Sequence, residues 1–69
     1  MEKVLLTKHH RRPRSQGGTS EMRNISYLPA NKHEAWNLLF GTMSPDEIAR
    51  EITYRYLDPD FELIVRRKP

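Results

Sequence analysis

A long polar run between two short apolar runs constrains the fold of this chain most. Residues 11–23 are mainly Arg, Pro, Ser, Gln, Gly and Thr, and Pro13 and Gly17-Gly18 mark turns within them. The apolar residues 4–6 before this run and 25–28 after it predict two short strands, the second ended by Pro29. The strands can pair as a hairpin with a long connection. A loop this long in so small a domain usually has a function.

Two helices are predicted after the hairpin. The first covers residues 30–40 and ends at Gly41, a typical residue after a helix C-terminus. At about 100° per residue, its apolar side chains form one broad face. These side chains are Ala35, Trp36, Leu38, Leu39 and Phe40.

The second helix is predicted over residues 45–56. Ser44 is its N-cap, Pro45 occupies its first turn, and Glu47 completes a capping box. Its packing stripe is predicted to consist of Ile48, Ala49, Ile52 and Tyr56. Alternating side chains over residues 61–65 predict a final half-buried strand. A frayed, solvated tail is expected for Arg66-Arg67-Lys68, with contact to phosphates as the second interpretation. The fold class expected is therefore α+β.

The 69 residues suffice for one domain with a small core and thin stability. Cysteine is absent, so a bound metal would have to use His, Asn, Asp or Glu. The net charge of +3 is concentrated near both ends of the chain, which suits a polyanionic partner. No apolar run approaches membrane length and no export signal is recognisable, so we expect a cytoplasmic protein.

The residues that can carry chemistry lie within residues 8–40. His9-His10 follow the first apolar run, and His33 and Asn37 lie one turn apart at the edge of the apolar helix face. Asn24 opens the second apolar run. Hydrolysis of a phosphodiester needs a base, a group that orients it and a cation, and imidazole and amide side chains can supply or bind these. Neighbouring residues of a flat strand point to opposite faces, so His9 and His10 share a site only if the strand twists or ends there.

Each of these residues also has an ordinary structural reading. A His-His pair among arginines is commonly solvated surface, and Asn24 by itself suits a loop-capping turn. His33 suits a helix histidine that makes a hydrogen bond, and Asn37 suits a surface amide. Their joint spacing favours the functional reading.

That joint pattern resembles the HNH endonuclease family, and it is most similar to the nuclease domains of DNA-degrading colicins. The likeness covers about half of the chain. The residues that carry it are His9-His10, Pro13, Ser15-Gln16-Gly17-Gly18, Asn24-Ile25, His33 and Asn37. The resemblance implies a ββα-metal core over residues 1–41, extended by a helix and a short strand over residues 42–69 of the same domain.

The resemblance also implies a role for each matching residue. His10 corresponds to the general base and Asn24 to the residue that orients and polarises it. His9, His33 and Asn37 correspond to the ligands of one divalent cation. The colicin pattern has histidine at position 37, and asparagine there favours magnesium or manganese over zinc or nickel. Thr7 stands where that pattern has an acidic residue.

The enzyme implied is a metal-dependent endonuclease that hydrolyses DNA, with RNA as a second substrate class to consider. Basic side chains of the loop and its flanks are the expected phosphate contacts: Lys8, Arg11, Arg12, Arg14 and Arg23. Any sequence preference would be slight or supplied by a protein partner, and the size suits a phage or mobile-element nuclease. The chain is expected to be a monomer or a weak homodimer.

Two other hypotheses stay open. The first is a catalytically weak or inactive module of the same fold that binds nucleic acid or a larger assembly, which the changes at Thr7 and Asn37 favour. The second is self-association of residues 44–65 through the exposed edge of the final strand.

Overall fold

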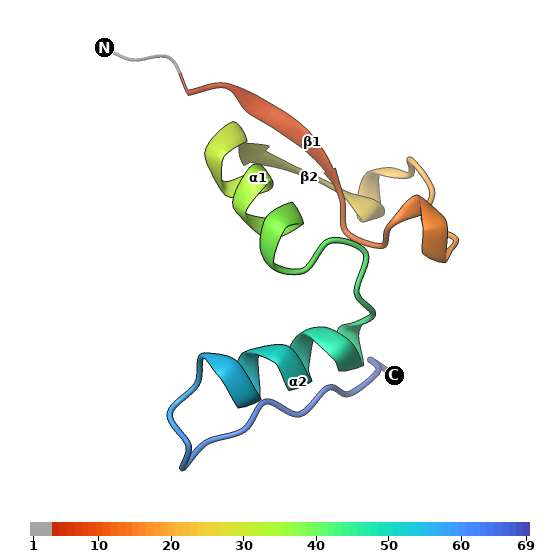
Figure 1. The fold of residues 1–69 in the computed structure, drawn as a ribbon. Helices are drawn as coiled ribbons and strands as arrows, with labels where there is room; N and C mark the ends of the chain where they lie inside the picture. The colour runs from red at the N-terminus through yellow and green to blue at the C-terminus, as the bar shows by residue number, and fades with distance from the viewer. Residues whose placement is uncertain (1–3) are drawn as a thin grey trace.

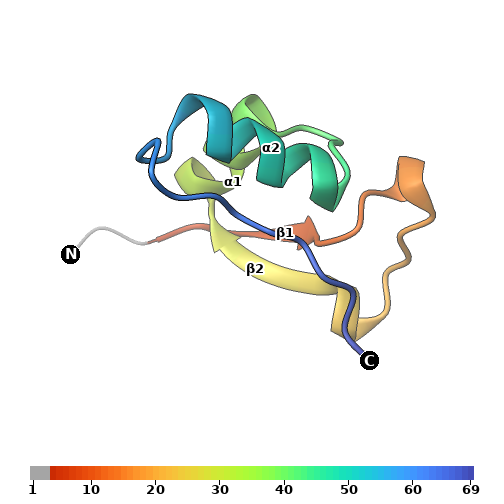
Figure 2. The same ribbon diagram turned by 90° about the horizontal axis from the view of Figure 1, so that it is seen from below.

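A computed structural model describes residues 4–69 as two antiparallel strands and two helices (Figure 1). The α+β class is confirmed. The elements in chain order are β1 (Leu6–His10), two 3₁₀ turns η1 (Arg14–Gln16) and η2 (Met22–Asn24), β2 (Ile25–Pro29), α1 (Ala30–Leu39) and α2 (Pro45–Arg55). Figure 2 shows α1 and α2 on the same side of the hairpin. The first three residues of the expected 1–41 core lie outside the described range.

The hairpin pairs β1 with β2 in a register that runs from Leu6 opposite Pro29 to His10 opposite Ile25. The first strand is present, with His9-His10 at its end as expected, but it begins only at Leu6, the last residue of the apolar run. Val4 and Leu5 are exposed and precede β1, whereas both neighbouring histidines lie within it. A strand extends as far as its partner supplies backbone hydrogen bonds, so β2 and not the apolar run sets the bounds of β1.

The loop between the strands is closed by backbone hydrogen bonds and by its glycines. The amide of Arg11 donates to the carbonyl of Asn24 at 2.7 Å, next to the last strand pair. Gly17 adopts a left-handed conformation with φ of 82° at the end of η1. A Cβ atom on Gly18 would overlap the backbone carbonyl of Arg12. The glycine pair therefore lets two backbone segments of the loop approach closely.

Helix α1 has the predicted bounds to within one residue, and Gly41 follows it with φ of 51°. The broad apolar face is not buried as predicted. Trp36 and Phe40 are half-buried and lie 4.6 Å apart between ring centroids, but Ala35, Leu38 and Leu39 are exposed. A sheet of two strands covers only a narrow strip of a helix, which leaves the rest of the apolar face uncovered.

Helix α2 confirms its predicted start. The Ser44 hydroxyl accepts from the Glu47 amide at 3.3 Å, and the Glu47 carboxylate accepts from the Ser44 amide at 3.1 Å. Ala49 on this helix is the one buried apolar residue among residues 4–69, while Tyr56 of the predicted stripe is exposed. The core is therefore as small as the chain length suggested.

The predicted final strand at residues 61–65 is wrong. These residues do not pair with β1 or β2, and residues 58–69 run back beside α2 (Figures 1 and 2). The amide of Leu63 donates to the Thr53 hydroxyl of α2 at 3.0 Å. An alternating pattern needs a strand partner to become a strand, and here the neighbour is a helix. Self-association through an exposed edge of that strand therefore loses its structural basis.

Candidate functional site

The structure brings two of the three histidines together. The ring of His9, on β1, lies 5.2 Å from the ring of His33, on α1, in an edge-to-face arrangement with an interplanar angle of 77°. Trp36, one turn further along α1, contacts the His9 ring at 5.7 Å between centroids. A strand residue and a helix residue thus meet where α1 packs on the hairpin.

His10 has a different neighbour. Its Nε2 atom lies 3.3 Å from the Ser20 hydroxyl in the loop. The different neighbours of His9 and His10 agree with the alternation of side chains along a strand. Within residues 4–69, no hydrogen bond or ring contact joins the His10 ring to His9 or His33.

Thr7 fixes the ring orientation of His33. Its hydroxyl oxygen lies 2.7 Å from His33 Nδ1 and 3.1 Å from the Leu28 carbonyl oxygen. The hydroxyl has one proton, and the Leu28 carbonyl can only accept, so the Thr7 hydroxyl donates to Leu28. His33 Nδ1–H then donates to Thr7, which leaves the lone pair on Nε2 free to bind a ligand.

The sequence interpretation treated Thr7 only as a departure from the colicin pattern. Thr7 and His9 are two residues apart on one strand, so their side chains project from the same face. That spacing was the available signal that Thr7 lies beside the histidine site.

Burial lowers the pKa of His9 below the usual histidine value, and the charges of His33, His10 and Arg11 lower it further. The neutral imidazole is therefore favoured at neutral pH. It is also the form that binds a metal ion.

The His9–His33 pair has suitable spacing for one divalent cation. With metal–nitrogen bonds of about 2.1 Å and tetrahedral angles, two imidazole rings on one ion have centroids about 5 Å apart. The observed separation of 5.2 Å agrees with that value. No three His, Cys, Asp or Glu side chains converge within residues 4–69, so a third protein ligand would be the amide oxygen of Asn37, exposed one turn after His33.

Asn24 does not contact the predicted base. Its side-chain oxygen accepts from the Arg12 amide at 2.7 Å, and its nitrogen donates to the carbonyls of Arg12 at 3.1 Å and Thr19 at 2.7 Å. These bonds agree with the ordinary interpretation of Asn24 as a loop-capping residue, and its role in orienting His10 stays a prediction. The backbone of the long loop needs hydrogen-bond partners, and Asn24 supplies three of them. Its role in the structure is to close the loop.

The predicted phosphate-binding side chains are all exposed, but they do not form one group. Arg14 donates to the Ser20 hydroxyl at 3.2 Å, so one hydroxyl contacts both this guanidinium and the His10 ring. Lys8 lies on β1 opposite Tyr27 and does not line the pocket described next. No pattern in the sequence indicates that Ser20 lies beside His10.

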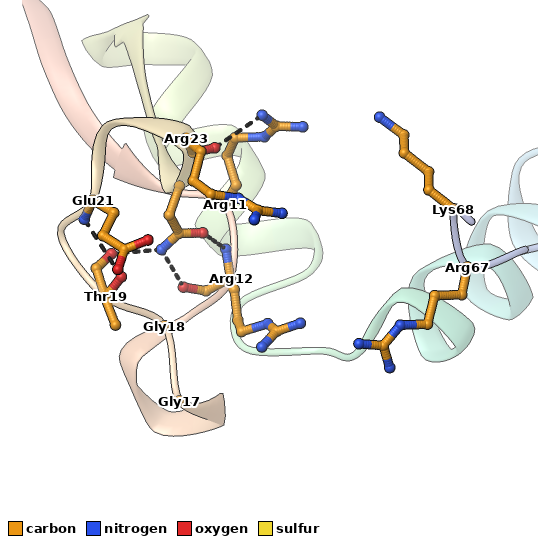
Figure 3. Close-up of a pocket in the computed structure, with 10 residues that line it drawn as sticks. Arg11, Arg12, Gly17, Gly18, Thr19, Glu21, Arg23, Arg67 and Lys68 are labelled. Atoms are coloured by element: carbon orange, nitrogen blue, oxygen red, sulfur yellow. Dashed lines mark hydrogen bonds between the residues drawn. The ribbon is translucent and has the colours of Figure 1, made fainter.

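A basic pocket of about 730 Å³ opens beside the loop (Figure 3). Arg11, Arg12 and Arg23 line one side of it, and Arg67 and Lys68 of the C-terminal segment face them from the other side. Glu21 is its single carboxylate, and the three histidines do not line it. The sequence interpretation assigned Arg67 and Lys68 to a solvated tail, and the structure instead places them in the wall of this pocket.

Comparisons with protein-family models, with curated proteins and with solved structures found no match to this chain. The helices between residues 4 and 69 are all too short or too polar to cross a bilayer.

Proposed function

We propose that this chain is a metal-dependent endonuclease of the HNH type, with a ββα-metal core that hydrolyses phosphodiester bonds in DNA. The observation that carries the proposal is the convergence of His9 and His33 across the packing contact between β1 and α1, 5.2 Å apart between ring centroids. His10 follows His9 as the last residue of the same strand, and the arginine-rich loop begins directly after it. These groups match the needs of a hydrolytic site, namely metal ligands, a base and cations for the phosphate.

His9, His33 and Asn37 would hold the cation. When bound, a divalent ion supplies Lewis-acid stabilisation of the phosphate oxygens and of the leaving oxygen. The Thr7 hydroxyl holds the His33 ring in the orientation that leaves Nε2 free to bind. The amide at position 37 is a harder ligand than a third imidazole, so magnesium or manganese is expected to support activity better than zinc or nickel.

His10 would take the proton from the attacking water. Its contact with Ser20 at 3.3 Å is long and exposed, which leaves Nε2 accessible to water. Arg14 donates to the same serine, and it would stabilise negative charge that develops on the phosphate oxygens. Asn24 supports both groups indirectly by keeping the loop closed.

A plasmid-nicking assay with magnesium, manganese, nickel and zinc in turn, and with EDTA as control, tests this function. His10→Ala is expected to lower the nicking rate by about 10²–10⁴-fold, the usual contribution of a general base. Metal binding should remain near the native level, because His10 is not a predicted ligand. Asn31→Ala, an exposed substitution on α1, is the matched control and should nick at the native rate. Native nicking by His10→Ala would show that the base is wrongly assigned.

A second candidate function is a nucleic-acid-binding module without cleavage. It is favoured by the hydrogen bonds of Asn24, which go to the loop and not to His10, and by the basic pocket, which excludes the histidines. Retention on DNA that weakens with salt, without nicking in any of the four metals, would select this function.

A further inference from the structure

The basic pocket combines charges from two distant parts of the chain. Arg11, Arg12 and Arg23 belong to the hairpin loop, whereas Arg67 and Lys68 come from the last residues. In Figure 3 these two groups of side chains face each other across an open space. Among residues 4–69 the one ion pair joins Arg55 to Glu51, so none of these five cations is paired with a carboxylate.

The course of the C-terminal segment explains how its charges reach the loop. A turn begins at Asp58, whose carbonyl accepts from the Phe61 amide at 2.9 Å. The bond from the Leu63 amide to Thr53 then fixes the returning segment beside α2. Residues 66–69 consequently end next to the loop and not at the far end of α2.

Five like charges around one space repel each other, and a bound anion relieves that repulsion. The volume of about 730 Å³ exceeds what a single phosphate group needs. The chemistry therefore suits several linked phosphates better than one isolated anion.

We propose that Arg67 and Lys68 form, with Arg11, Arg12 and Arg23, a clamp for the phosphate backbone of a nucleic acid, separate from the histidine site. The clamp holds phosphates outside the cleaved bond, and so it deepens the proposed nuclease function. Its existence as a binding site does not depend on cleavage. The C-terminal segment acts as the second wall of the clamp.

The test measures the affinity of the chain of residues 1–69 for a labelled duplex DNA at several salt concentrations, in EDTA so that no cleavage occurs. Each phosphate contact contributes about 0.9 to the slope of log affinity against log salt concentration. The double variant R67A/K68A should therefore lower that slope by about 1.8 and weaken binding about 60-fold at 0.1 M salt.

The matched control is K32A/R66A. It removes the same net charge, and one of its positions is adjacent to Arg67, but neither Lys32 nor Arg66 lines the pocket. Its salt slope should stay at the native value. Glu21→Gln removes the single carboxylate of the pocket and should strengthen duplex binding. Circular dichroism of each variant checks that the fold is retained.

Inorganic phosphate serves as a competitor that separates a backbone clamp from a site for a free anion. At a phosphate concentration equal to that of the duplex phosphates, it should leave duplex binding unchanged. Displacement of the duplex at that concentration would overturn the clamp, as would equal slopes for R67A/K68A and K32A/R66A. If the slope falls as expected but no metal supports nicking, the clamp holds and the nuclease function fails. If nicking occurs while the salt slopes of R67A/K68A and K32A/R66A are equal, the nuclease function holds and the clamp fails.

Discussion

The hairpin with α1 and the segment formed by α2 with the C-terminal residues are held together in different ways. In the first region, side-chain hydrogen bonds join residues far apart in sequence, such as Thr7 with His33, 26 positions away, and Arg12 with Asn24, 12 positions away. In the second region most side-chain bonds are local, and the longest joins Leu63 to Thr53, 10 positions apart. The capping box spans three positions and the Glu51–Arg55 ion pair spans four.

The two regions therefore contribute differently: one positions the histidines, and the other adds charged side chains to the basic pocket. The region with long-range bonds holds the histidines in a defined arrangement, although neither region has a substantial core. The region with local bonds contributes charge to the basic pocket through its last residues. A small chain can thus define a site with polar contacts between elements where apolar burial is insufficient.

The largest expected effect of a single substitution is that of Gly18→Ala. The added Cβ would overlap the Arg12 carbonyl, and backbone cannot move aside without breaking the bonds that close the loop. We expect a loss of about 3 kcal/mol in the free energy of unfolding, at the upper end for overpacking. Thermal unfolding followed by circular dichroism measures it.

Gly17→Ala is the matched control for that change. Gly17 has a left-handed φ of 82° but open space around its Cβ position. The cost should be about 1–2 kcal/mol, the usual penalty for a side chain in this conformation. A larger loss for Gly17→Ala than for Gly18→Ala would show that the loop is packed differently.

Removal of the N-cap of α2 should have a smaller effect on stability. It tests whether α2 is independent of the hairpin and α1. Ser44→Ala leaves the amide of Glu47 without its acceptor and should cost about 1 kcal/mol in the free energy of unfolding. For a domain of this size, that corresponds to about 4–8 °C in Tm. Ser15→Ala, in an exposed turn, should leave the Tm unchanged. Metal-dependent nicking should persist in Ser44→Ala below its Tm, and a loss of nicking there would show that α2 is needed to position the histidines.

The sequence predicted the local features well because their causes lie within a few residues. The capping box at Ser44, the end of α1 before Gly41 and the turn at Gly17 all follow from side chains close to each other in the chain. The meeting of His9 with His33 was implied by a family resemblance and not by periodicity.

The failures concern partners that only the folded chain brings together. No local pattern indicates that Asn24 bonds to the Arg12 backbone. The spacing of Thr7 and His9 indicates that Thr7 lies beside the histidine site, but not that it bonds to His33. Residues 61–65 alternate as a strand does, but they lie along a helix. The exposure of Leu38 was missed for the same reason. The apolar pattern of α1 does not reveal that the two strands cover only a narrow strip of the helix.

The smallest expected effect is a loss of stability in mild acid, and it tests whether His9 belongs to the long-range region. The pKa of His9 is lowered in the folded chain, first by burial and then by neighbouring positive charge. The unfolded chain therefore binds a proton more readily than the folded one, and stability increases with pH through this window. The stabilisation is complete above the unfolded value of about 6.5 and is lost as the pH falls through the folded pKa.

Unfolding measured in EDTA between pH 5 and pH 8 should therefore give a lower Tm on the acid side. The effect should be small, because His9 is only half-buried and solvent screens its charge. His9→Phe keeps an aromatic ring against Trp36 but cannot bind a proton, so its Tm should depend less on pH than that of the native chain. An identical pH dependence in both proteins would mean that the His9 ring is not packed between α1 and the hairpin. In that case the contrast between a long-range and a local region would rest on the hydrogen bonds of Thr7 and Asn24 alone.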